Sequence, residues 1–158
     1  MIHYVKGNLL DSDCDYICHQ VNCQGVMNSG IAKQIRERWP IVYKVYKNRY
    51  DYHTSIGVTS DDMLGNVDLI PIDGEWTRFV FNMYSQADYG YDGKCYTSYD
   101  AFANCLGTIW AMVPNGCRVG FPKNIGCCRG GANWNIISTM IEEVLGKDFE
   151  VYIYELED

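Results

Sequence analysis

Two glycine-rich stretches of this chain each follow a predicted strand and precede a predicted helix. In the first, an apolar strand over residues 15–20 is followed by Asn22, Gly25 and Gly30 and then by a helix. The first turn of a helix leaves backbone N–H groups unpaired at the positive end of the helix dipole, so such a loop attracts phosphate without a nearby lysine or arginine. The second stretch covers residues 123–132. Together the two loops predict a diphosphate site, and hence a small nucleotide-like ligand.

His19 is the residue best suited to move a proton at this site. Hydrolysis of a phosphate ester needs a group that attacks, or one that handles the proton of the attacking or leaving oxygen. An imidazole titrates near neutrality, and His19 lies close to the predicted end of its strand. We therefore predict that His19 is catalytic. The alternative is a structural histidine that is hydrogen-bonded to the backbone.

Asn22, three residues after His19, is the second candidate for ligand contact or catalysis. Its alternative is a turn residue whose side chain bonds its own backbone. Asp88 and Asp92 lie in a tyrosine- and glycine-rich loop, where each is either an acid or base or a solvated carboxylate. Arg129 is either a phosphate ligand or surface charge.

The pattern of apolar residues predicts alternating strands and helices. Ile31, Ile35 and Trp39 recur at every fourth position, which is typical of an amphipathic helix. Asp73-Gly74 between two apolar runs predicts a tight hairpin, and thus one antiparallel pair. A three-layer α/β/α sandwich with a mixed six-stranded sheet fits this order best. The predicted strands cover residues 2–6, 15–20, 67–72, 77–84, 117–121 and 149–154, and the predicted helices cover 29–39, 41–50, 98–113 and 134–145.

Length and composition limit the class of protein. With 158 residues, 47% of them hydrophobic, we expect a single domain over residues 1–158. The formal net charge of -7 argues against a basic surface for nucleic acid, but it leaves room for a local phosphate site. No apolar stretch is long enough to cross a bilayer and no leader is recognisable, so we expect a cytoplasmic protein without a membrane partner. The eight cysteines include no C-x-x-C pair, which favours reduced thiols and neither a metal nor a cofactor.

Four stretches, in order along the chain, resemble the macro domain family, whose members bind ADP-ribose. Residues 19–32 are similar to the first substrate loop of the branch that contains phage and bacterial proteins and the yeast-type ADP-ribose 1''-phosphate phosphatase. Residues 122–134, with Ile125-Gly126-Cys127 inside them, resemble the second phosphate loop. Residues 4–10 and 89–94 match two further loops. The resemblance covers essentially the whole chain and implies the macro domain fold.

The resemblance also implies a role for each matching position. It places Asn8 and the Leu9 backbone at the adenine, with Leu156 at its border. It places Asn22 at the distal ribose, and the N–H groups of Gly30 and Ile31 at the phosphates. The other residues of the implied ADP-ribose site are Met27, Ser29, Ile125, Gly126, Cys127, Cys128 and Arg129.

This chain departs from the family pattern in three places. Asn8 stands where many relatives have Asp, and a neutral amide accepts a hydrogen bond from the adenine amino group more weakly than a carboxylate does. Cys128 replaces the second glycine of a Gly-Cys-Gly motif and adds a Cβ beside the ligand path. Gln86 and Gly130 fall where the ADP-ribosyl-glutamate hydrolase branch has a catalytic Lys and Asp, so we do not expect that lysine mechanism here.

The resemblance leaves three hypotheses for the function. The first is a phosphoric monoester hydrolase that converts ADP-ribose 1''-phosphate to ADP-ribose and phosphate, with His19 acting at the phosphoryl group. The second is a hydrolase that removes ADP-ribose from modified protein or nucleic acid, using Asn22 and a bound water. The third is a non-catalytic ADP-ribose-binding module. Each implies a small nucleotide as partner, in the host cytoplasm if the protein is encoded by a phage.

Overall fold

In the computed structural model, which describes residues 1–90, 92–127 and 129–157, six strands form one mixed sheet. The order across the sheet is β1-β6-β5-β2-β4-β3, and every neighbouring pair is parallel except β3 and β4. The mixed six-stranded sheet predicted from the sequence is therefore confirmed. The strands are β1 (Ile2–Lys6), β2 (Tyr16–Asn22), β3 (Val67–Pro71), β4 (Phe79–Gln86), β5 (Arg118–Pro122) and β6 (Glu150–Glu155).

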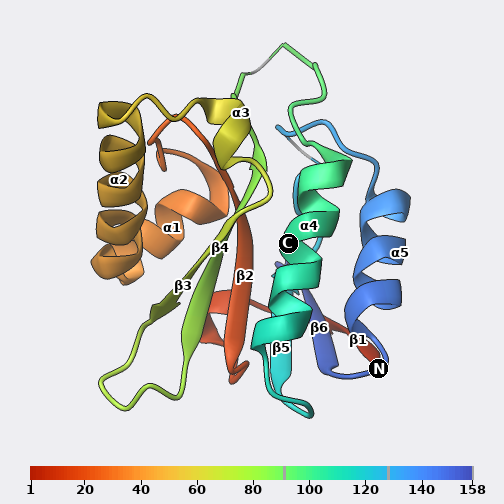
Figure 1. Cartoon of the computed structure of the whole chain (residues 1–158). Coiled ribbons are helices and arrows are strands. Elements are labelled where there is room, and N and C mark those ends of the chain that lie inside the picture. The colour runs from red at the N-terminus through yellow and green to blue at the C-terminus, as the bar shows by residue number, and fades with distance from the viewer. Residues whose placement is uncertain (91, 128, 158) are drawn as a thin grey trace.

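Helices cover both faces of the sheet and complete the three layers (Figure 1). On one face lie α1 (Gly30–Arg38) and α2 (Pro40–Ser55), and on the other lie α4 (Tyr99–Met112) and α5 (Trp134–Leu145). Two short elements that the sequence analysis did not predict are the 3-10 helix η1 (Leu9–Asp11) and the single-turn helix α3 (Ser60–Met63). None of the helices in the described ranges is long and apolar enough to span a membrane.

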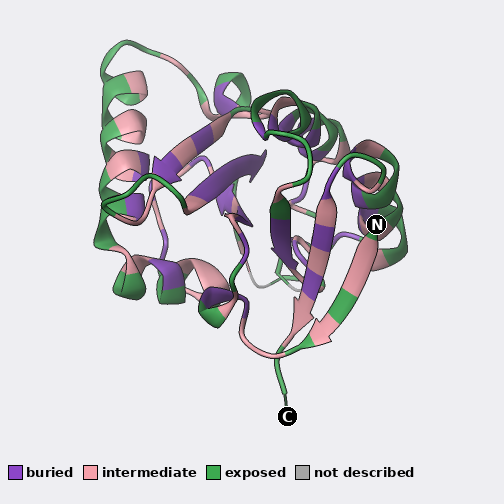
Figure 2. Ribbon diagram, turned by 90° about the horizontal axis from the view of Figure 1, so that it is seen from below, coloured by how far each residue is buried: buried purple, intermediate pink, exposed green. Residues whose placement is uncertain are grey.

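The two-residue alternation of the central strands divides the core between the two faces. In β2, Ile17 and Val21 pack toward α1 and α2, whereas Tyr16 and Cys18 pack toward α4 and α5. Figure 2 shows the buried residues gathered in the central strands and on the inward sides of the helices. His19 belongs by this alternation to the α1/α2 face.

Two local predictions need correction. The loop between β3 and β4 is longer than the predicted Asp73-Gly74 tight turn, because Asp73 instead accepts a hydrogen bond from the backbone N–H of Thr77 at 2.9 Å. The positive φ in this loop belongs to Trp76, at 57°. Strand β2 extends to Asn22 rather than ending at Gln20, because Val21 and Asn22 still pair with β4 beyond the predicted end. His19 is therefore a mid-strand residue.

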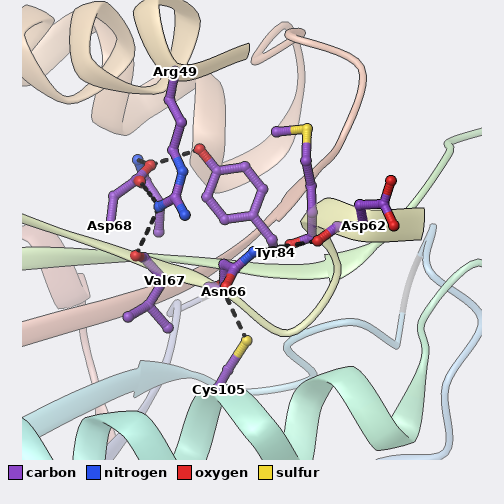
Figure 3. Close-up of polar contacts among 9 residues, drawn as sticks. Arg49, Asp62, Asn66, Val67, Asp68, Tyr84 and Cys105 are labelled. Carbon is purple, nitrogen blue, oxygen red and sulfur yellow. Dashed lines mark hydrogen bonds and ion pairs between the residues drawn. The ribbon is translucent and has the colours of Figure 1, made fainter. Parts of the chain in front are cut away.

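A buried carboxylate ties α2 to the sheet. Asp68 of β3 accepts hydrogen bonds from Arg49 of α2 at 2.6 Å and from the Tyr84 hydroxyl of β4 at 2.7 Å (Figure 3). The Asn82 amide donates to the same carboxylate at 3.2 Å. Burial and the adjacent Asp68 charge raise the pKa of Tyr84. A charge removed from water in this way is stable only while its partners remain, because an unpaired buried ion loses its hydration without compensation.

Replacing the buried carboxylate of β3 should therefore destabilise the protein far more than replacing an exposed carboxylate on α2. We expect Asp68→Ala to lower the free energy of unfolding by about 3–5 kcal/mol in urea titrations. Asp51→Ala, which removes an exposed ion pair with Lys47, should cost less than about 1 kcal/mol. If Asp68→Ala does not fold, Tyr84→Phe is the substitute, because it removes one hydrogen bond to Asp68. It should lower the free energy of unfolding by about 1–2 kcal/mol. Equal losses for Tyr84→Phe and Asp51→Ala would contradict this account.

Candidate functional site

A cavity of about 720 Å³ follows the edge of the sheet at which the five parallel strands end. Parallel strands bring their carboxyl ends to one edge, and open α/β sheets bind ligands there. The strand spacing of about 4.8 Å separates the segment after β1 from the segment after β4 by about 19 Å along this edge, so the cavity suits an elongated ligand. The lining follows the sheet order: Gly7–Leu9 after β1, residues 154–156 at the end of β6, residues 122–126, 129 and 130 after β5, residues 20–22, 26–32 and 34 around the end of β2, and residues 86, 89 and 90 after β4.

The amino end of α1 opens into this cavity. Ser29 is the N-cap, but its side chain makes no capping hydrogen bond. Within the described part of the chain, the backbone N–H groups of Gly30, Ile31 and Ala32 have no partner, and all three residues line the cavity. Gly30 has a φ of +59°, and a Cβ there would meet nothing within 4 Å, so the backbone is open to a ligand. The first predicted glycine-rich loop thus leaves three backbone N–H groups available at the cavity.

The second glycine-rich loop lies beside the first, because β5 and β2 are neighbours in the sheet. It is closed tightly at Gly130, where a Cβ would lie 2.3 Å from the Thr97 hydroxyl and 2.4 Å from the Gly126 carbonyl oxygen. The Gly130 carbonyl also accepts hydrogen bonds from the backbone N–H groups of Tyr96 and Thr97, at 2.7 and 3.0 Å. This loop and the segment before α4 therefore form one connected wall.

A ladder of neutral side chains connects that wall to the ends of β2 and β4. The Ser85 hydroxyl donates to the side-chain oxygen of Gln20 at 2.7 Å. The side-chain amide of Gln20 donates to the side-chain oxygen of Gln86 and, at 3.0 Å, to the Thr97 hydroxyl. Thr97 in turn donates to the Gly126 carbonyl oxygen at 2.8 Å. Gln86 and Gly130, the positions that the resemblance matches to a Lys and an Asp, both lie next to Gln20. Gln86 accepts a hydrogen bond from the Gln20 amide, and a Cβ at Gly130 would lie 3.0 Å from Gln20 Nε2. No side chain longer than a hydrogen fits at Gly130 without moving this ladder.

Asn22 lines the cavity but also holds its own loop. Its amide donates to the Val26 carbonyl oxygen at 2.9 Å, and its side-chain oxygen accepts from the Gln24 N–H at 2.9 Å and from the Tyr46 hydroxyl at 2.7 Å. One amide hydrogen of Asn22 is not used in these bonds and can face a ligand. The structure therefore combines a position at the cavity with the turn-forming role that was the alternative for Asn22.

His19 does not line the cavity. Its side chain is fully buried on the α1/α2 face of the sheet, and its Nε2 lies 2.5 Å from Oδ1 of Asn82. Because the Asn82 amide group donates to Asp68, its oxygen faces His19, so His19 Nε2 carries the proton and Nδ1 is the acceptor. Nδ1 has no hydrogen-bond partner in the described structure. The geometry gives the predicted catalytic role of His19 no support.

Most of the other implied ligand residues do come together around this cavity. Cys127 is not among the lining residues, and its thiol instead contacts the Ile125 carbonyl oxygen at 3.4 Å, while Cys128 lies outside the described residues. Asp88 and Asp92 do not line the cavity either, and both are exposed. The lining includes Asn8, Leu9, Asn22, Met27, Ser29, Gly30, Ile31, Ile125, Gly126, Arg129 and Leu156.

Two polar residues at the ends of the cavity, Glu155 and Gln20, were not predicted from the sequence. At the β1 end, Glu155 pairs with Lys6 at 3.1 Å and with Lys123 at 3.2 Å, and Glu155 is the only carboxylate among the described lining residues. At the β4 end, the lining includes Gln20 and Gln86. The two-residue alternation could have found Gln20, because it faces away from His19 on the same strand. The middle of the cavity therefore presents hydrogen-bond donors without a carboxylate.

Comparisons with known proteins agree with this architecture. No protein-family model matches the chain. The macrodomain of Thermus aquaticus DarG superposes with a TM-score of 0.77 and 21% identity, covering 98% of each chain. A protein from Bacteroides thetaiotaomicron gives a TM-score of 0.78 with 26% identity, covering 98% of this chain and 97% of that one. Thermosipho africanus DarTG in complex with ADP-ribose gives a TM-score of 0.76 with 19% identity, covering 99% of this chain and 41% of that one.

Curated proteins show the same relationship in sequence. The DNA ADP-ribosyl glycohydrolase of Thermus aquaticus is 23% identical over 157 residues, which is 98% of this chain and 41% of that protein. The enzyme of the same name from Mycobacterium tuberculosis is 43% identical over 47 residues, 30% of this chain and 13% of that protein. An ADP-ribose 1''-phosphate phosphatase of Scheffersomyces stipitis is 40% identical over 52 residues, 29% of this chain and 30% of that protein. The chain thus matches less than half the length of each of these curated relatives.

The buried histidine should make stability depend on pH. Burial lowers the pKa of His19 to about 4, against smaller upward effects of the Asn82 hydrogen bond and the Asp68 charge. Between pH 6.5 and 4 the unfolded chain binds a proton at His19 that the folded chain does not, so stability falls as the pH falls through this window. The loss should reach about 3 kcal/mol.

His19→Gln, which keeps a donor toward Asn82, should lack this part of the pH dependence. The measurement is urea unfolding of both proteins at intervals from pH 7 to pH 4. Parallel stability curves for the two proteins would show that His19 is not held neutral in the folded state.

The closed form of the second loop should depend on Gly130. Gly130→Ala forces the new Cβ against Thr97 and Gly126, so we expect a loss of about 1–3 kcal/mol in the free energy of unfolding. Gly107→Ala on α4 is the matched control, because its Cβ would meet nothing within 4 Å, and it should stabilise the protein by about 0.5–1 kcal/mol. An unchanged free energy of unfolding in Gly130→Ala would mean that the loop accommodates the extra Cβ.

Proposed function

Because this chain is a macro domain, a member of an ADP-ribose-binding and hydrolase family, we propose that its cavity binds ADP-ribose and removes a group from the distal ribose. The diphosphate would lie between the two adjacent glycine-rich loops, where the open N–H groups of Gly30 and Ile31 meet it. The base would lie toward Asn8, Leu9 and Leu156 at the β1 end. The distal ribose would then reach the segments after β2 and β4, near Asn22.

The proposed reaction is hydrolysis of ADP-ribose 1''-phosphate to ADP-ribose and phosphate. The observation behind this choice is that the cavity between its ends presents backbone N–H groups, amides and Arg129 but no described carboxylate. Such a surface stabilises a departing phosphate, because preformed donors hold the negative charge that develops on the leaving group. Its described side chains include no carboxylate to act as a general base for activating water. The net charge of -7 also favours a small phosphate ester over a nucleic acid strand.

This arrangement favours a step in which phosphate leaves from the anomeric carbon. The C1''–O bond breaks and its electron pair goes to the phosphate oxygen, a water oxygen bonds to C1'', and the proton released by that water goes to the phosphate. His19 plays no part in this step, because it is buried away from the cavity. The mechanism therefore differs from the attack at phosphorus expected from the sequence.

A second candidate is release of ADP-ribose from a modified macromolecule. The specific observation in its favour is that the similarity to the Thermus aquaticus DNA ADP-ribosyl glycohydrolase spans 98% of this chain, whereas the similarity to the phosphatase spans 29%. The purified protein incubated separately with ADP-ribose 1''-phosphate, ADP-ribosylated DNA and ADP-ribosylated protein would distinguish the two. Release of phosphate from the first substrate alone supports the phosphatase. Binding of ADP-ribose without turnover of any substrate would indicate that the protein is a non-catalytic binding module.

His19→Gln should retain phosphate release within about threefold of the wild-type rate, because less than about 1 kcal/mol of barrier depends on a residue outside the cavity. Turnover in 18O-labelled water should give unlabelled phosphate, since cleavage of the C1''–O bond leaves the phosphate oxygens untouched. Label in the phosphate would instead indicate attack at phosphorus. Loss of activity in a His19→Gln protein that still binds ADP-ribose would indicate that His19 is catalytic.

A further inference from the structure

The end of β2 and the loop that follows it are held by α2. Tyr46 of this helix is fully buried and is not among the described residues that line the cavity. Its hydroxyl accepts the backbone N–H of Val26 at 3.1 Å and donates its one hydrogen to Asn22, whose backbone and side-chain oxygens lie 2.8 and 2.7 Å away. Four residues further along α2, the ring of Tyr50 packs so closely on Gly25 that a Cβ there would lie 2.8 Å from it. Helix α2 therefore contacts the loop through these two tyrosines.

The same contacts fix how the Asn22 side chain meets a ligand. Its oxygen faces two donors, the Gln24 N–H at 2.9 Å and the Tyr46 hydroxyl. A backbone N–H can only donate, so the atom that faces Gln24 is the oxygen and the other atom is the amide nitrogen. That nitrogen donates one hydrogen to the Val26 carbonyl oxygen at 2.9 Å. Because Asn22 lines the cavity, its second amide hydrogen makes it a donor toward a ligand.

The core around Tyr46 keeps its hydroxyl in place and protonated. Burial raises the pKa of Tyr46, so the hydroxyl retains the hydrogen that it donates to Asn22. Its ring stacks on that of Tyr84, with 5.7 Å between the ring centroids, and the Tyr84 hydroxyl donates to the buried Asp68 (Figure 3). Because the ring has no room to move, the hydroxyl is a fixed donor at the end of β2.

We propose that Tyr46 is a positioning residue for the distal-ribose end of the cavity, where it holds the Asn22 amide with its remaining hydrogen directed at an oxygen of that ribose. This inference rests on the proposed function, which places the distal ribose near Asn22. Without the Tyr46 hydroxyl, the Asn22 oxygen loses a donor and the Val26 N–H loses its acceptor, which favours a rearranged loop because buried polar groups are costly to leave unpaired. Tyr46 touches no ligand in this arrangement and acts through Asn22.

The test compares two ligands that share the adenosine diphosphate and differ in the distal ribose. In titration calorimetry, Tyr46→Phe should bind ADP-ribose about fivefold more weakly than the wild type does, the effect of one neutral hydrogen bond. It should bind ADP as the wild type does, because ADP lacks the part that reaches Asn22. An equal loss of affinity for the two ligands would overturn the proposal, since it would show a change of the whole cavity and not of its distal end.

Tyr84→Phe is the matched control. It makes the same change in an equally buried ring that stacks on Tyr46, but the hydroxyl that it removes binds Asp68 and not the loop. This variant should lose stability and still bind both ligands within about twofold of the wild type, because the Asn22 contacts remain. If Tyr46→Phe does not fold, the comparison is made in the stabilising Gly107→Ala background. A loss of ADP-ribose affinity in Tyr84→Phe equal to that in Tyr46→Phe would contradict a specific role of Tyr46.

A double-mutant cycle tests whether Tyr46 acts through Asn22. Asn22→Ala should weaken ADP-ribose binding by at least about fivefold, and adding Tyr46→Phe to it should cost no further affinity. An unchanged affinity in Asn22→Ala, or additive losses in the double variant, would overturn the proposal while leaving the proposed function intact. If the wild type binds neither ADP-ribose nor ADP at millimolar concentration, the proposed function fails and this inference fails with it.

Discussion

The parallel pairing of five strands is the constraint on which the site depends. It gathers the segments after β1, β6, β5, β2 and β4 at one edge of the sheet, although residues 7–9 and 154–156 lie at opposite ends of the chain. It also sets the order of chemical groups along the cavity, with cationic and apolar residues at the β1 end, backbone donors in the middle and amides at the β4 end. An elongated ligand with a charged centre matches that order, because each section of the edge offers a different chemistry.

Two polar networks, one on each face of the sheet, fix the strands that form the site. On the α1/α2 face, the Asp68 carboxylate orients Asn82, which in turn fixes the tautomer of His19. On the α4/α5 face, Ser85 and Gln20 connect the strand ends to Thr97 and the second loop. The first network is ionic and buried, so it contributes to stability and orientation only as a complete set. The second is neutral and reaches the cavity.

The sequence was sufficient for the fold and for the positions of the two glycine-rich loops, because both follow from local patterns. Apolar periodicity gave the order of elements, and the glycines after β2 and β5 marked two segments whose backbone lines the cavity. The sequence was not sufficient for His19, since a difference of two residues in the length of β2 moves a side chain from the strand end into the core. Nor did it show the orientation of the Asn8 amide, which depends on a cap that forms only when η1 folds. Gln20 was missed because its contacts with Gln86, Ser85 and Thr97 are distant in sequence.

The neutrality of the Gln20, Ser85, Gln86 and Thr97 ladder has a consequence for the behaviour of the protein in solution. None of these side chains gains or loses a proton in the range where the protein is folded. This ladder therefore keeps the same charge from acidic to alkaline buffer, and the direction of each hydrogen bond in it is unchanged. Any pH dependence of ligand binding must therefore arise from titrating groups other than these four side chains.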